Sequence, residues 1–166
     1  MLLYHGSNQA VKIPKVAKPQ RGLDFGSGFY LTPNSDQAKR FSKIIKNRFK
    51  TGIPTVSVYE YDELSAQTSL QIAVFSSPNR EWLEFVRDNR LKSYDGPQYD
   101  VIIGPVANDR VFPTIQALVM MQFTVEAALV ALRPFKLFTQ YCLATEKALS
   151  VLRFVNFLTL EESADA

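Results

Sequence analysis

A single histidine stands next to a glycine near the start of the chain. His5 supplies an imidazole that can donate or accept a hydrogen bond. Gly6 has no side chain, so a ligand can approach its backbone closely. His5 is the only histidine and Cys142 the only cysteine. The sequence therefore excludes an intrachain disulfide, a cysteine metal cluster and any serine–histidine triad that does not use His5. A lone histidine at a strand end is also common in a purely structural role.

A second pattern lies at residues 24–32, with the sequence DFGSGFYLT. Its two glycines allow the chain to fold tightly just before a short aromatic strand. Successive side chains of a strand point to opposite faces. If Phe29 and Leu31 face the core, Tyr30 faces the other side, where its ring could stack on a planar ligand. The same pattern also fits ordinary core packing.

Strands and helices alternate irregularly along the chain, which favours an α+β fold over a doubly wound parallel sheet. Residues 8–27 contain prolines and glycines without periodicity and predict a long loop. The patterns predict strands at 2–5, 28–32, 55–61, 70–75, 99–106, 139–144 and 151–160. They predict helices opened by Thr32-Pro33 and at 79–90, 113–121 and 124–132, with a helical turn at 146–149.

The 166 residues are expected to form one domain, 1–166, with a polar tail from about 161. Hydrophobic residues make up 46% and charged residues 21%, which excludes a disordered chain. The longest apolar runs, 117–121 and 127–132, are far shorter than the roughly 20 residues that cross a bilayer. The first residues lack the pattern of a signal peptide. We therefore expect a cytoplasmic protein without membrane contact.

Positive charge is concentrated in the first third of the chain. Residues 1–53 hold ten lysines and arginines against two acids, and many of the basic residues fall in the predicted helix around 36–50. This asymmetry is typical of a surface that meets an anionic partner, such as a phosphate-bearing ligand or a nucleic acid. A solvated basic face would have the same composition, so both interpretations stay open.

Three segments taken together resemble the ADP-ribosyltransferase fold: 3–7 (LYHGS), 24–32 (DFGSGFYLT) and 99–106 (YDVIIGPV). They are similar to its histidine–tyrosine branch, which includes poly(ADP-ribose) polymerases and diphtheria-type toxins. They also resemble a bacterial family of short proteins often encoded beside a small partner, as in toxin–antitoxin pairs. The resemblance runs from about residue 2 to about 158. It implies a split, mostly antiparallel β-sandwich with flanking helices.

The resemblance also implies roles in binding NAD as a co-substrate. His5 would hydrogen-bond the adenosine ribose, and the Gly6 backbone would hold the nicotinamide carboxamide. Tyr30 would stack on the nicotinamide, opposite Phe41, which is expected on the buried stripe of the next helix. The rings of His5 and Tyr30 would face one concave pocket. The implied NAD-binding set is His5, Gly6, Ser7, Gly28, Tyr30 and Phe41.

The family's catalytic glutamate has no counterpart here, because Gln140 occupies its position at the head of a late strand. A glutamine can orient a ribose hydroxyl but carries no negative charge. Losing a charged contact costs roughly 1.5–3 kcal/mol, about ten- to a hundredfold in rate. His5, Tyr30 and Gln140 would thus form a slow, toxin-like mono-ADP-ribosyltransferase that modifies a macromolecular acceptor, with a small antitoxin-like protein partner.

Two alternatives remain. The chain could be a catalytically weak or inactive NAD-binding module in which Gln140 marks lost chemistry. It could also bind nucleic acid through the basic helix 36–50, with an affinity that falls steeply with salt.

Overall fold

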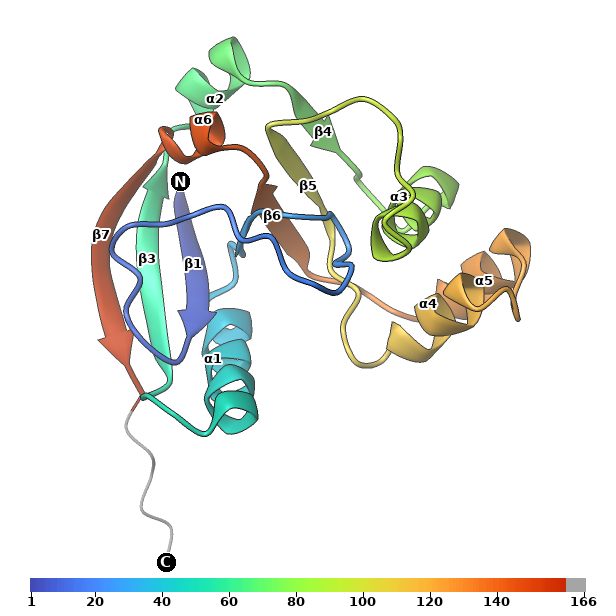
Figure 1. The fold of residues 1–166 in the computed structure, drawn as a ribbon, viewed down its shortest axis with the longest axis horizontal. Helices are drawn as coiled ribbons and strands as arrows, with labels where there is room; N and C mark the ends of the chain where they lie inside the picture. The colour runs from blue at the N-terminus through green and yellow to red at the C-terminus, as the bar shows by residue number, and fades with distance from the viewer. Residues whose placement is uncertain (161–166) are drawn as a thin grey trace, which may run out of the picture.

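Two β-sheets carry the fold in the computed structural model, which describes residues 1–160 (Figure 1). The first sheet has the order β1-β3-β7, with both pairs antiparallel. The second has the order β2-β6-β5-β4, in which only β4 and β5 run parallel. The strands are β1 (Leu2–Ser7), β2 (Phe29–Leu31), β3 (Thr55–Tyr61), β4 (Ile72–Val74), β5 (Val101–Pro105), β6 (Thr139–Leu143) and β7 (Leu152–Thr159). The predicted tail from about 161 lies outside the described residues.

The helices gather in three places around the sheets (Figure 1). α1 packs on β1 and β3, while α3, α4 and α5 pack against one another beside the second sheet. α2 and α6 lie together at the end of the molecule that also holds the amino terminus. The helices are α1 (Ser35–Phe49), α2 (Glu63–Ser69), α3 (Arg80–Arg90), α4 (Phe112–Val119), α5 (Val125–Leu132) and α6 (Glu146–Leu149). The predicted α+β class is confirmed, with mostly antiparallel sheets.

Two hydrophobic cores lie on opposite faces of the second sheet. One joins the two sheets and contains Leu3, Phe29 and Tyr59. The other lies between the second sheet and α3–α5 and contains Trp82 and Cys142. Both Trp82 and Cys142 are fully buried. The alternation along β2 is also as predicted, because Phe29 enters the first core while the neighbouring tyrosine packs against the second.

Helix α1 begins later than the sequence predicts. The side chain of Asn34 accepts a hydrogen bond from the Gln37 N–H at 3.0 Å and caps the helix, so the prediction of Thr32 as the cap is wrong. The Thr32 hydroxyl accepts from the Asn34 N–H at 3.1 Å and donates to Oε1 of Gln37 at 2.7 Å. It also lies 3.2 Å from the Thr139 carbonyl oxygen, so it connects the start of α1 with β6. The unpredicted α2 has only one buried residue, Ala66, and so lacks an apolar stripe that sequence could reveal.

The buried face of α1 also differs from the predicted apolar stripe. Ala38 and Ser42 are buried, whereas Phe41 and Phe49 are exposed, at 45% and 60%. The reason is Gly6 on β1, where an added Cβ would lie 2.1 Å from the Ala38 carbonyl oxygen. The helix backbone therefore rests directly on the strand backbone. Only small side chains fit at this contact, and the large aromatic residues turn outward.

This contact predicts a steric penalty at Gly6. The change Gly6→Ala should lower the free energy of unfolding by about 3 kcal/mol, because two backbones would have to separate. Gly104→Ala is the matched control: its nearest neighbours are the side chains of Phe25 and Phe75 at 3.1 Å, and its loss should be about 1 kcal/mol or less. Urea unfolding measures both. Equal losses would contradict the close packing of α1 on β1.

Candidate functional site

Strands β1 and β2 touch at one bridge and then separate. Tyr4 and Thr32 exchange two backbone hydrogen bonds of 2.9 Å, and this isolated pair is the extent of the ladder between the two strands. Backbone groups two residues apart in a strand point to the same side. The N–H and C=O of Gly6 thus face β2 beyond the bridge, where the described residues offer them no ladder partner. We call this place the β1–β2 junction.

His5 is held rigidly at the junction. Its ring stacks on Phe29, with centroids 4.4 Å apart and an interplanar angle of 27°. Its Nδ1 lies 2.7 Å from the Tyr30 carbonyl oxygen. Because a carbonyl only accepts, Nδ1 must carry the proton, and Nε2 of the neutral ring is left as an acceptor. Burial lowers the pKa of His5 below 6.5, although the bond to Tyr30 opposes the shift, so the ring is neutral at physiological pH.

Tyr30 is fixed by its hydroxyl as well as by its ring. The hydroxyl donates to the Gly26 carbonyl at 2.7 Å and accepts from the Phe25 N–H at 3.1 Å. The ring packs against the core beside α3, and burial raises its pKa well above 10.0. The phenol therefore fastens the turn that precedes β2.

The rings of His5 and Tyr30 lie against different faces of β2, one on Phe29 and the other in the helix-covered core. The expectation that both rings face one pocket is wrong, because it overlooked that neighbouring residues of β2 alternate between two cores. The imidazole instead meets the backbone carbonyl of Tyr30. Tyr30 positions His5 through its main chain.

Gln140 holds a buried amide with an unused donor. It is 8% exposed, and its Nε2 has no hydrogen-bond partner within residues 1–160. Tyr30 pairs with Cys142, so Gln140, two residues earlier on β6, lies on the same sheet face as the Tyr30 ring. The adjacent Thr139 is bonded to Thr32 of the bridge, so the backbone of Gln140 lies near the junction, while its amide lies on the sheet face opposite the His5 ring. Leaving such a donor unpaired costs about 1–3 kcal/mol, which a ligand oxygen would relieve.

Ser7 and Phe41, two further residues of the predicted NAD-binding set, lie at positions that a ligand can reach. Ser7 ends β1 and donates from its Oγ to Oδ1 of Asn8 at 3.4 Å. Phe41 is exposed on α1 beside Ser42, which contacts Gly6, so the prediction of a buried Phe41 is wrong but its ring is available for stacking.

Gly28 has a structural role. Its N–H and C=O are both bonded to Ala17, and an added Cβ would lie 2.3 Å from Sγ of Cys142. Its backbone is therefore not free to hold a ligand, contrary to its predicted place in the binding set. Sequence reasoning also missed Thr32, which joins β1, β2 and β6 but resembles an ordinary helix cap in the sequence.

Within residues 1–160, no three histidine, cysteine or carboxylate side chains form a group able to hold a metal ion. None of the helices in residues 1–160 is both long and apolar enough to cross a bilayer.

The lowered pKa of His5 predicts a pH-dependent stability. Below pH 6.5 the unfolded chain binds a proton that the folded chain excludes, so the free energy of unfolding falls as the pH drops from 6.5 toward the lower folded pKa. His5→Asn should remove this component while its amide keeps a donor near the Tyr30 carbonyl. Urea unfolding between pH 5 and pH 8 compares the two proteins. Equal slopes would contradict a buried neutral imidazole.

Comparison with known proteins gives a family but no activity. No curated protein and no solved structure matches the chain. Residues 1–154 match the model of a family described as a protein of unknown function, DUF3990. The match spans both sheets, including the β1–β2 junction and Gln140. The chain therefore belongs to the DUF3990 family.

Proposed function

We propose that this protein is an NAD-dependent mono-ADP-ribosyltransferase of the ADP-ribosyltransferase-like fold, toxin-like in type. The observation that carries the proposal is the β1–β2 junction, where the Gly6 backbone lies beyond the ladder beside a histidine of fixed tautomer. A peptide N–H and C=O on one strand edge match a planar carboxamide, which can donate and accept side by side. The nicotinamide of NAD carries such a group.

The neighbouring groups complete the contacts to NAD. Nε2 of His5 accepts a hydrogen bond from a hydroxyl of the adenosine ribose. The exposed ring of Phe41 stacks on the nicotinamide, an interaction worth about 0.5–1.5 kcal/mol beyond burial. Tyr30 acts through its carbonyl, as a positioning residue for His5. These contacts orient the ring whose bond to ribose must break.

In the reaction, the bond between C1′ of the ribose and the nicotinamide nitrogen breaks, and the electron pair leaves with neutral nicotinamide. C1′ acquires oxocarbenium character and is attacked by a nucleophilic atom of the macromolecular acceptor, which loses a proton to solvent. Gln140 donates from its unpaired Nε2 to a hydroxyl oxygen of the nicotinamide ribose and holds it in place. Because the amide is uncharged, it stabilises the developing positive charge less than a carboxylate would.

The resemblance also supplies the wider setting of the proposal: a protein or nucleic-acid acceptor and a small antitoxin-like partner. The basic surface of α1 favours an acceptor with negative charge, since Lys43, Arg48 and Lys50 are exposed there and the only acid on the helix is Asp36. Nucleic-acid binding by this helix alone remains the second candidate function.

The proposal is tested by incubating the full chain with NAD labelled in the adenylate and with cell lysate. We expect slow transfer of label to a macromolecule with matching nicotinamide release. His5→Ala should abolish both. Tyr30→Ala keeps the main-chain carbonyl that holds His5 and removes the hydroxyl that fastens the turn before β2, so it should lower the rate without abolishing it. Gln140→Glu should raise the rate about ten- to a hundredfold, since it restores a charged contact. Arg133→Ala, at an exposed position at the end of α5, is the control and should leave the rate unchanged.

The other functions give different results. Calorimetric NAD binding without nicotinamide release, in both the natural chain and Gln140→Glu, would contradict the enzyme and identify a binding module. Salt-sensitive nucleic-acid binding that NAD does not alter, without any label transfer, would identify a nucleic-acid protein. Undiminished transfer in His5→Ala would overturn the assigned site.

A further inference from the structure

The outer side of α5 carries an apolar residue between two opposite charges. Val130 and Arg133 follow Glu126 by four and seven residues, and this spacing places all three on one side of an α-helix. Arg133 ends α5 with helical backbone angles (φ −51°, ψ −39°), so it continues the same row of side chains. All three residues are exposed, Val130 at 55%. We call this row the α5 stripe.

The other side of α5 holds the helix in place. Ala128 and Leu132 are buried there, and α5 packs against α3 and α4. Figure 1 shows α4 and α5 at the edge of the molecule remote from the first sheet. The α5 stripe therefore points away from the rest of the described chain, on a helix whose orientation is fixed.

The surface around the α5 stripe is almost free of charge. Residues 111–135 contain only two charged side chains, and both belong to the stripe. The turn between α4 and α5 adds three large apolar side chains that are exposed: Met120 (58%), Met121 (90%) and Phe123 (40%). Exposed apolar surface of this kind marks contact with another protein, whereas a nucleic acid would need several cations.

The two charges of the α5 stripe can both accept a further partner. Glu126 is paired through Oε1 with Arg80 of α3, yet its side chain stays 69% exposed, and a carboxylate has a second oxygen that accepts hydrogen bonds. Arg133 forms no ion pair within residues 1–160. A surface that matches the stripe must therefore offer an anion to Arg133, a cation to Glu126 and an apolar group between them.

The α5 stripe itself has this arrangement in reverse order. In a twofold contact, residue i meets residue j of the other copy and j meets i. An axis midway between Glu126 and Arg133 brings each carboxylate to the guanidinium of the other copy and places the two Val130 side chains close together. Ala127 and Ala131 beside the stripe are small enough for helices to approach to about 8–10 Å. Parallel packing would instead place like charges together.

We propose that the outer face of α5 is the interface of a homodimer, in which two copies pack antiparallel with reciprocal Glu126–Arg133 ion pairs around Val130. The apolar residues supply most of the affinity, because exposed ion pairs contribute little by themselves. The charges fix the antiparallel direction. The inference is independent of the proposed transferase reaction, since it uses none of the residues at the β1–β2 junction.

Sedimentation equilibrium of the full chain, from about 5 to about 500 μM, tests the proposal. We expect the mass of the natural chain to rise from one copy toward two. Arg133→Glu should weaken the dimer at least about tenfold, because acids then face each other at both ends of the stripe. The exchanged variant Glu126→Arg/Arg133→Glu should restore the dimer, since each copy again offers the charge that the other needs.

The matched control is Lys43→Glu on α1, which makes the same change of charge at an exposed position outside α5 and should leave the dimer unchanged. Thermal melts verify that every variant is folded. A natural chain that stays monomeric over the whole range would overturn the proposal. So would a dimer that tolerates Arg133→Glu, equal weakening by Lys43→Glu, or a folded exchanged variant that does not dimerise.

One further variant separates this interface from the proposed reaction. His5→Ala should lose transfer of label from NAD and still dimerise as the natural chain does. Loss of the dimer in His5→Ala would contradict an interface confined to α5.

Discussion

The close approach of α1 to Gly6 is the constraint on which the site depends. The helix backbone occupies the space that a side chain at position 6 would need. This contact fixes the helix against the first sheet at the point where β1 leaves β2. A glycine is therefore required at position 6 by packing, and the same residue carries the peptide edge that has no ladder partner on β2. Gly6 is thus needed both for the packing of α1 on β1 and for the proposed contact to the ligand.

The second sheet contributes the polar amide of Gln140, and the first contributes the Gly6 peptide, which has no ladder partner on β2. Thr32 connects the bridge to Tyr4 with the start of β6, which carries Gln140 on the sheet face that also holds the Tyr30 ring. Its unpaired Nε2 is costly in a protein that binds nothing and useful in one that binds a hydroxylated ligand. A buried donor kept without a partner is the kind of local conflict that functional sites retain at the expense of stability.

Sequence patterns predict the strands and the α+β class well, because alternation and β-branched runs are local properties. The opposite orientations of Phe29 and Tyr30 along β2 followed from the alternation rule. The sequence predictions were wrong where contacts between segments distant in the chain determine the orientation of a side chain. The outward turn of Phe41 depends on contact with Gly6, and the separation of the His5 and Tyr30 rings depends on which core each face of β2 meets.

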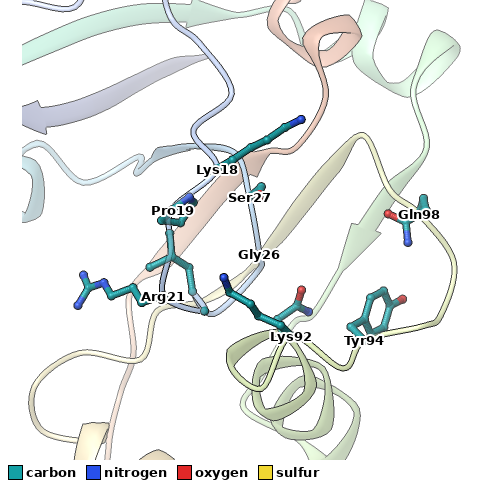
Figure 2. A pocket seen from close by; sticks show the side chains of 11 residues that line it. Lys18, Pro19, Arg21, Gly26, Ser27, Lys92, Tyr94 and Gln98 are labelled. Carbon is teal, nitrogen blue, oxygen red and sulfur yellow. The ribbon is translucent and has the colours of Figure 1, made fainter.

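A cavity of about 380 Å³ between the loop that precedes β2 and the segment that follows α3 could not be derived from the sequence at all (Figure 2). Its two walls are far apart in the chain, and the sequence signals a long basic loop without indicating that α3 closes over it. The buried pair of Asp24 and Arg90 joins the walls, and charged residues so far apart give no local sign of pairing. Tertiary contacts of this kind are invisible to periodicity.

A crystal structure of the full chain soaked with NAD tests the central claim most directly. The account predicts the nicotinamide carboxamide hydrogen-bonded to both the N–H and the C=O of Gly6, with a hydroxyl of its ribose at the Gln140 amide. Nicotinamide bound elsewhere, with the peptide edge of Gly6 facing only water, would contradict it.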